Sequence, residues 1–240
     1  MSLTAALLDP LLAGAAAARP LITYYDDATG ERIELSAVTT ANWAAKAANL
    51  LRDECDVEPG TPVAALLPAH WQTAAVLLAA WSCGAEVVVD PLHADWVLCD
   101  GDRVDLALAA EPAGGVLALS LDAFGKGLPG LPGGVIDFAT EVRSHGDEFV
   151  PWSPVPDDAP ALAGSTVAQV LAAARTRAAA LDLGPTDRVL STLDWARIED
   201  LTDGLLAVLA AGASLVQCRH PDPAALPRRA ETERTTRQLS

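Results

Sequence analysis

The sequence is poor in basic residues: it has 16 Lys and Arg against 32 Asp and Glu, which gives a formal net charge of −16 at pH 7. Phosphate-rich partners bind through Lys and Arg, so this charge argues against DNA, RNA and anionic lipid as partners. Aromatic residues are also scarce, at 5% of the chain, whereas 51% of the chain is hydrophobic. We therefore expect a folded core built chiefly from Ala, Leu and Val rather than a disordered chain.

Cysteines are few, and the sequence has no C-x-x-C pair and no uncharged apolar run of 18 residues. The wide spacing of Cys55, Cys83, Cys99 and Cys218 favours the reduced thiols of the cytosol over a disulfide framework or a zinc site. Residues 1–20 are apolar but lack the basic start of a signal peptide, and we expect an amphipathic helix there. The sequence thus predicts a cytoplasmic protein with no membrane partner.

One pattern of turn, strand, helix and strand occurs twice. The first copy, residues 57–91, reads VEPGTPVAALLPAHWQTAAVLLAAWSCGAEVVVDP, and the second, residues 183–221, reads LGPTDRVLSTLDWARIEDLTDGLLAVLAAGASLVQCRHP. In each copy a Gly-Ala pair follows an Ala/Leu-rich helix, and glycine can close a helix in the left-handed conformation. Two strands joined through a helix in one sheet run parallel. Each copy is therefore predicted to be a strand–helix–strand crossover.

A further helix is predicted upstream of each copy, over residues 38–53 and 167–181. In the first, Trp43, Ala47 and Leu50 recur at helical spacing. Two copies of helix–strand–helix–strand predict an α/β chain whose two related halves form parallel-type sheets flanked by helices. We expect the following division: a first half with an N-terminal hairpin (1–120), a Gly/Pro-rich connection with a short strand or helix near 135–142 (121–160), a second half (161–226), and a polar tail that frays (227–240).

Two long segments resemble a known family. Residues 20–91, from PLITYYDDATG to AEVVVDP, are similar to the opening section of the adenylate-forming enzymes, and residues 181–226, from LDLGPTDRVL to RHPDPAAL, are similar to the section after their phosphate loop. The order and spacing of these segments resemble the N-terminal domain of that family, which includes acyl-CoA synthetases, nonribosomal-peptide adenylation domains and luciferases. The resemblance covers about residues 20–226 and is closest to short, stand-alone, actinobacterial-type versions of the domain.

The resemblance implies a phosphate loop near residue 164. The family's loop has the form YTSGTTGxPKG and grips the ATP phosphates, whereas this chain has ALAGSTVAQV at the equivalent point. Gly164, Ser165 and Thr166 match the small hydroxyl core, but the second glycine, the proline, the lysine and the closing glycine have no counterparts. The sequence also stops at Ser240, before the family's aromatic-Gly-x-Thr-Glu segment and its C-terminal domain with a catalytic lysine. We expect a degenerate remnant of the loop.

The same three residues have a second interpretation, in which Ser165 or Thr166 is the N-cap of the following helix. The two interpretations are compatible, because a capped helix N-terminus still carries partial positive charge. Loss of the lysine alone removes a charge-assisted contact of about 1.5–3 kcal/mol. We therefore expect no catalytic residues, no metal and no cofactor, with ATP or AMP and magnesium binding only if a partner chain completes the site.

Other candidate residues are weaker. Lys126 in AFGKGLPG lacks the first Gly and the Ser/Thr of a P-loop, so a flexible loop is favoured. His93, Asp95 and Cys99 provide too few ligands for a metal, and a loop is favoured there as well. His220 follows a predicted strand, at the carboxyl end where α/β proteins place ligands. The sequence offers His220 no evident base or nucleophile partner.

The sequence therefore predicts a truncated, catalytically degenerate relative of the AMP-dependent acyl-CoA synthetases, kept as a binding or regulatory module. One alternative is one part of a split ligase, completed by a partner chain that supplies the adenine segment and the catalytic lysine. Another is a nucleotide or acyl binder without chemistry. A homodimer or a partner protein that covers the truncated face is also expected.

Overall fold

The chain forms two compact units. The computed structural model describes the backbone of residues 1–240 and all side chains except those of residues 15 and 16. Unit 1 comprises Met1–Ala5, Ala41–Leu67 and Ala75–Val170, and unit 2 comprises Ala6–Thr40, Pro68–Ala74 and Leu171–Ser240. The units are interleaved along the chain, and each contains one β-sheet. The consecutive division proposed above, at residues 120, 160 and 226, stays a prediction.

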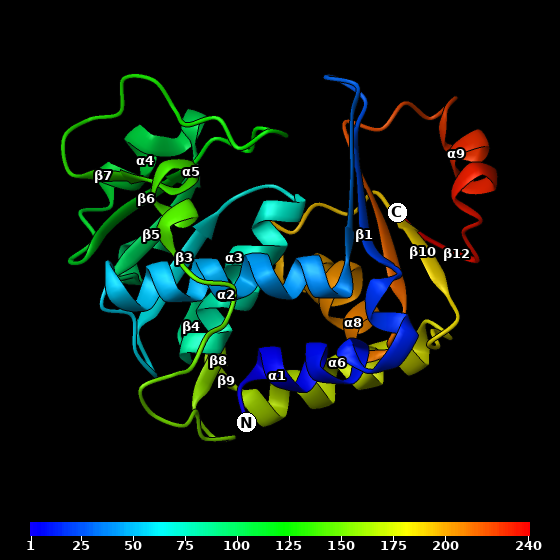
Figure 1. The fold of residues 1–240 in the computed structure, drawn as a ribbon, viewed down its shortest axis with the longest axis horizontal. Helices are drawn as coiled ribbons and strands as arrows, with labels where there is room; N and C mark the ends of the chain where they lie inside the picture. The colour runs from blue at the N-terminus through cyan, green and yellow to red at the C-terminus, as the bar shows by residue number, and fades with distance from the viewer. The chain divides into compact units, whose positions relative to one another are not determined.

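Unit 1 contains a seven-stranded sheet with the order β7-β6-β5-β3-β4-β8-β9 (Figure 1). Its strands are β3 (Pro62–Leu66), β4 (Glu86–Val88), β5 (Trp96–Asp100), β6 (Gly115–Leu119), β7 (Val135–Asp137), β8 (Pro160–Leu162) and β9 (Ser165–Thr166). All neighbouring pairs are parallel except β8 and β9, which form an antiparallel hairpin.

The buried residues of unit 1 are chiefly Ala, Leu and Val, as the composition predicts. The helices associated with this unit are α2 (Ala37–Asp53), α3 (Trp71–Cys83), α4 (Val104–Ala109) and α5 (Phe138–Glu141). Val104 and Ala107 of α4 pack on strand residues such as Val97 and Val116. Partly buried leucines of the Gly/Pro-rich connection, Leu128 and Leu131, also pack there, so this segment contributes to the core.

Unit 2 contains a five-stranded sheet with the order β12-β10-β11-β1-β2. Its strands are β1 (Pro20–Asp26), β2 (Glu31–Ser36), β10 (Arg188–Ser191), β11 (Ser214–Arg219) and β12 (Arg237–Leu239). The predicted N-terminal hairpin is confirmed, because β1 and β2 are antiparallel, while the other neighbouring strands are parallel. The helix α6 (Val167–Ala180) precedes β10 in the chain.

Both predicted crossovers are confirmed. In unit 1, α3 connects the parallel pair β3 and β4. In unit 2, β10 and β11 are parallel and are connected by α7 (Ile198–Leu201), the π-helical segment η6 (Thr202–Leu206) and α8 (Ala207–Ala210). The predicted α/β class, with parallel-type sheets flanked by helices, is therefore the class of this fold.

The Gly-Ala pairs end the crossover helices in the predicted way. Gly84 has a φ of +83° and Gly212 a φ of +73°. The amide after each glycine donates to the carbonyl five residues earlier, at 2.9 and 3.1 Å, which is the bond of a Schellman cap. A Cβ added to Gly84 would lie 3.1 Å from the Cα of Pro59, and one on Gly212 would lie 3.4 Å from the Cβ of Pro185. In each copy, therefore, the helix stop packs against the proline-containing turn.

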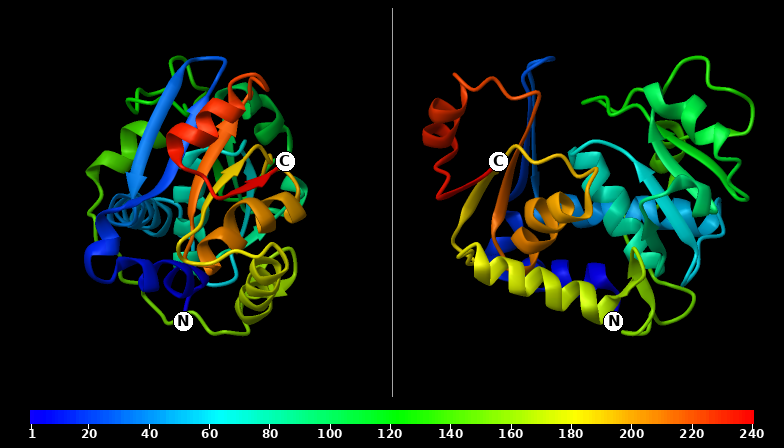
Figure 2. Two further views of the ribbon diagram at one scale, coloured as in Figure 1. Left: turned by 90° about the vertical axis from the view of Figure 1, so that its right-hand side faces the viewer. Right: turned by 180° about the vertical axis from the view of Figure 1, so that it is seen from behind.

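Two predictions about the chain termini are wrong. The expected amphipathic helix in residues 1–20 is limited to α1 (Leu3–Leu8), followed by 3-10 turns η1 (Asp9–Leu12) and η2 (Gly14–Ala18); Pro10 removes a helix donor at that point. The tail expected to fray instead forms α9 (Leu226–Glu233) and the strand β12. Figure 2 shows α9 beside the sheet of unit 2. Leu226 and Ala230 of this helix pack on three buried strand residues (Leu190, Val216 and Cys218).

Candidate functional site

The expected remnant of the phosphate loop lies in a β-hairpin. Leu162 of β8 pairs with Ser165 of β9, and the two residues between them have φ values of +46° (Ala163) and +81° (Gly164). A two-residue hairpin loop of type I′ requires positive φ at both positions, which explains the glycine. The helix α6 begins directly after β9, at Val167.

Thr166 caps this helix, as one of the two interpretations predicts. The amide of Gln169 donates to Thr166 Oγ1 at 3.3 Å, and the amide of Thr166 donates to Gln169 Oε1 at 2.9 Å. This reciprocal pair is a capping box, which satisfies two amides that the helix itself leaves free. Ser165, the other candidate cap, lies one residue earlier and pairs with Leu162 in the hairpin.

The remaining amides at the helix start are also engaged by acceptors of unit 1. Gly164 N–H donates to Glu86 Oε1 at 2.7 Å, and the amides of Val167 and Ala168 each donate to a main-chain carbonyl at 2.9 Å. Between residues 164 and 169, five backbone amides therefore have acceptors within the chain (those of residues 164, 166, 167, 168 and 169). A phosphate here would have to displace these acceptors, and the Glu86 carboxylate would repel it.

The structure does not assemble the weaker candidates into a site. Lys126 lies in a turn that Asp122 Oδ1 closes by accepting the amides of Phe124 and Lys126. The exposed ring of His93 lies 3.2 Å from Asp90, whereas burial raises the pKa of the Cys99 thiol to about 12. In the part of the chain that the structure describes, no three His, Cys, Asp or Glu side chains form a metal-binding group. Within the same part, no helix is both long and apolar enough to cross a membrane.

His220 has a partner that the sequence did not reveal. It lies after β11 with a φ of +46°, and its Nδ1 is 2.9 Å from Oδ1 of Asp26, the last residue of the adjacent strand β1. A carboxylate only accepts, so Nδ1 carries the proton. Burial by itself raises the pKa of Asp26, but hydrogen bonds from His220 and the Ala28 amide outweigh burial and lower this pKa. The exposed imidazole is thus oriented by a buried carboxylate, an arrangement suited to proton transfer at Nε2.

A second histidine lies buried in the same unit. His70 Nδ1 accepts a hydrogen bond from the amide of Gln72 at 3.0 Å and so caps the start of α3. Its ring packs edge-on against the ring of Tyr24, with 4.3 Å between the ring centroids. Its Nε2 is 3.8 Å from Glu31 Oε1, too far for a hydrogen bond, and neither atom has another partner among the described residues. Burial lowers the pKa of His70, although Glu31 opposes this effect. His70 is therefore a neutral capping residue.

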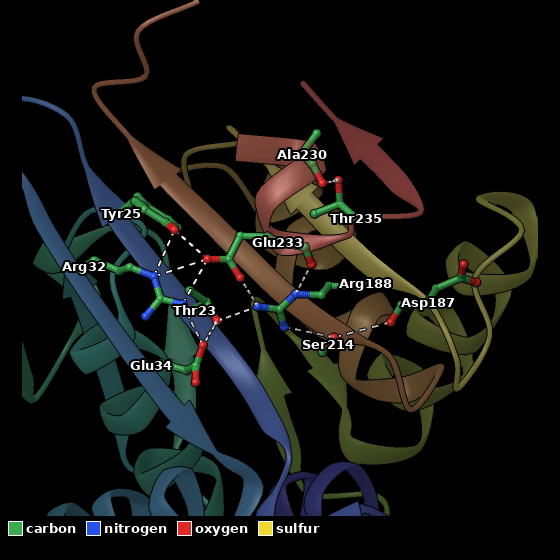
Figure 3. Close-up of polar contacts among 10 residues, drawn as sticks. All are labelled: Thr23, Tyr25, Arg32, Glu34, Asp187, Arg188, Ser214, Ala230, Glu233 and Thr235. Atoms are coloured by element: carbon green, nitrogen blue, oxygen red, sulfur yellow. Dashed lines mark hydrogen bonds and ion pairs between the residues drawn. The ribbon is translucent and has the colours of Figure 1, made fainter. Parts of the chain in front are cut away.

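The polar centre of unit 2 is the carboxylate of Glu233, at the end of α9 (Figure 3). Its Oε1 accepts from Tyr25 Oη at 2.5 Å and from an Arg32 nitrogen at 2.9 Å, and its Oε2 accepts from Arg188 at 2.6 Å. Burial by itself raises the pKa of Glu233, but the hydrogen bonds from Tyr25, Arg188 and Arg32 lower it to about 2. The network joins β1, β2 and β10 to α9. Its central residue, Glu233, lies in the segment that we expected to fray.

No family model matches the chain. A Mycobacterium tuberculosis protein described as a TIGR03089 family protein is 56% identical over 242 residues, which cover 99% of this chain and 98% of that protein. The chain belongs to the TIGR03089 family.

Solved structures confirm the expected resemblance to adenylate-forming enzymes at the level of the fold. A Brucella canis acyl-CoA synthetase matches 99% of this TIGR03089 family member with a TM-score of 0.81 and 19% identity. A benzoate CoA ligase from Burkholderia xenovorans LB400 matches 99% of the chain with a TM-score of 0.75 and 19% identity. The anthranilate CoA ligase AuaEII, solved with anthranoyl-AMP, matches 97% of the chain with a TM-score of 0.72 and 13% identity. The matches cover 47%, 50% and 47% of those proteins, so the chain spans about half of their length.

Proposed function

We propose that this TIGR03089 family member is a catalytically degenerate relative of the AMP-dependent acyl-CoA synthetases that acts as a binding or regulatory module. One observation carries the proposal. At the position of the phosphate loop, five backbone amides from residue 164 to residue 169 already donate to acceptors of the chain itself, and one of those acceptors is the Glu86 carboxylate.

The physical argument concerns the charge of a triphosphate. Binding it requires several convergent N–H donors and a cation that offsets its charge. The segment from Ala161 to Val170 contains no lysine or arginine, and a missing charge-assisted contact costs about 1.5–3 kcal/mol, roughly ten- to a hundredfold in affinity. Stabilisation of a developing charge during adenylation would be weaker still. The segment at residues 164–169 is therefore poorly suited to hold ATP for adenylation.

The direct test is ATP–pyrophosphate exchange with magnesium and a panel of aliphatic and aromatic carboxylic acids. The matched control is the Ser165→Ala/Thr166→Ala variant, which keeps the Ala163–Gly164 turn, and its fold is checked by circular dichroism. We expect the wild type and the variant to give the exchange of a protein-free blank. Exchange by the wild type that the variant loses would refute the proposal.

Thermal-shift measurements separate a ligand-binding role from a purely structural one. A ligand that binds only the folded state raises the melting temperature, and the rise grows with the logarithm of the ligand concentration above Kd. A rise with AMP, ATP or acyl-CoA without any exchange identifies a nucleotide or acyl binder without chemistry. The expected cytoplasmic location is part of this proposal and stays a prediction.

A second candidate function is one part of a split ligase. The observation that favours it is that the matched ligases are about twice as long as the region they share with this chain. A partner would then supply the adenine segment, the magnesium site and the catalytic lysine. Affinity purification of the tagged chain, followed by exchange assays on the purified complex, tests this function. Exchange by the complex but not by the chain alone supports the split ligase, whereas a homodimer without exchange supports the first proposal.

A further inference from the structure

Unit 2 has a groove of about 690 Å³ that borders the Glu233 network, because Arg188 and Glu233 are part of its lining. Its lining includes Arg188 and Ser214, the first residues of β10 and β11, and Pro20, the first residue of β1. The groove therefore lies at the amino ends of these parallel strands, whereas His220 follows the carboxyl end of β11. It is also distinct from the hairpin at Gly164, which is part of unit 1.

Most charges in the lining are neutralised within the protein. Figure 3 shows Arg188 directed at Glu233, with nitrogen–oxygen distances of 2.6 Å to the carboxylate and 2.8 Å to the carbonyl. The carboxylate of Asp187 lies 3.4 Å from an Arg237 nitrogen, and it also accepts from Thr236 Oγ1 at 2.6 Å and from the amide of Gly184 at 2.8 Å. These groups have no free charge to offer a ligand.

Two arginines in the lining form no ion pair with the described residues. Arg19 and Arg234 are both exposed, and neither guanidinium has an ion-pair partner among the described residues. In a chain with a net charge of −16, most arginines have a carboxylate within reach, as Arg177 and Arg229 do. The charged residues of the lining are three arginines and two acids, so the groove carries a net charge of +1 in a chain whose net charge is −16.

Arg234 occupies its place at a conformational cost. It ends α9 in the left-handed conformation, with a φ of 53°, where glycine or asparagine is the usual residue. A side chain at this position is strained, because its Cβ crowds the following carbonyl. Strain retained in a groove is a reason to look for a ligand there.

Most of the remaining lining is apolar. Leu11, Leu21 and Pro185 contribute to its walls, together with Pro10, Ala37 and Ala213. A ligand that fits this groove has an apolar body for these walls and an anionic head for the arginines. A phosphate monoester has two negative charges, which match two free guanidinium groups, and three terminal oxygens that accept their forked donors.

We propose that this groove binds an organic phosphate monoester with an apolar body, held by Arg19 and Arg234. The proposal concerns unit 2 alone and goes beyond the proposed function, since it is independent of any nucleotide at residues 164–166. The site would give the protein a ligand without giving it a reaction.

Isothermal titration calorimetry with hexyl phosphate tests the proposal. We compare the wild type with Arg19→Gln, Arg234→Gln and the double variant, and use Arg197→Gln, an exposed arginine of unit 2 outside the groove, as the matched control. We expect saturable binding that each single variant weakens about tenfold or more, that the double variant loses, and that Arg197→Gln keeps. Hexanoate and inorganic phosphate are expected to bind more weakly, and hexanol not at all.

Loss of folding is excluded by a further variant, Arg234→Gly. We expect it to raise the melting temperature, because glycine relieves the strain at φ 53°, and to weaken binding as Arg234→Gln does. The proposal is overturned if hexyl phosphate does not bind at millimolar concentration, if the double variant binds it as the wild type does, or if hexanol or hexanoate binds equally well.

Discussion

The substitution Glu233→Gln tests whether the network in Figure 3 stabilises unit 2. The pKa of Glu233 is lowered from 4.5 to about 2, and its side chain is only 7% exposed. A shift of that size corresponds to about 3 kcal/mol of stabilisation by the ionised carboxylate. The amide has nearly the same shape but no charge, and it leaves the half-buried Arg188 without its carboxylate. We expect a loss of about 3 kcal/mol in the free energy of unfolding at pH 7.

The pH dependence follows from the direction of the shift. Because the folded pKa of Glu233 lies below the unfolded value, the stabilisation is fully present above about pH 4.5 and is lost as the pH falls towards 2. Urea unfolding at a series of pH values measures the difference between wild type and variant, which should shrink towards zero in acid. The matched control is Glu231→Gln, an exposed glutamate on the same helix. The reasoning is refuted if Glu233→Gln is no more destabilising than this control, or if the difference persists at pH 2.

Three further predictions concern the two crossovers and the helix caps. Gly84→Ala should lower the free energy of unfolding in urea by about 2 kcal/mol, because its Cβ would lie 2.9 Å from a Val155 methyl carbon at a φ of +83°. Gly212→Ala should lower it by only about 1 kcal/mol, because its nearest neighbour is 3.4 Å away. Equal losses for the two variants would contradict this. Thr166→Ala should cost about 1 kcal/mol by removing the capping box, and Thr166→Ser should restore most of it. The pKa of His70 is lower in the folded than in the unfolded state, so unfolding takes up a proton and stability should fall as the pH drops below about 6.5. The variant His70→Asn keeps a helix cap and should remove this pH dependence of the unfolding free energy. An unchanged pH dependence would show that another group causes it.

The repeated crossover could be predicted from the sequence because its signals are local. The glycines at 84 and 212 follow apolar helices directly, and each helix lies between two short β-branched runs, so neighbouring residues determine the structure. The hairpin between β1 and β2 was predictable for the same reason. The resemblance to adenylate-forming enzymes likewise rested on the order of segments that are each continuous in the chain.

The sites were less predictable because their partners are far apart in sequence. Asp26 and His220 are 194 residues apart and meet only because β1 and β11 pair in register. From the sequence, residues 227–240 look like a polar tail, because the hydrogen-bond partners of Glu233 are not nearby. Tyr25 and Arg32 lie about 200 positions earlier in the chain. The amides near residue 164 have acceptors that the local sequence does not predict, among them Glu86. Such pairings follow from topology, which composition and periodicity do not encode.

The Glu233 network also has a consequence for the order of events during synthesis. Ribosomes extend a chain by about 5–20 residues each second, so Glu233 emerges on the order of 10–40 s after Tyr25 and Arg32. Until then the first hairpin has neither its carboxylate nor α9, and β12 has yet to join β10. During that interval Arg32 has only Glu34 of its own hairpin as an ion-pair partner, and the edge of β1 stays open until β11 is synthesised. A chaperone or a premature partner strand can capture this open edge.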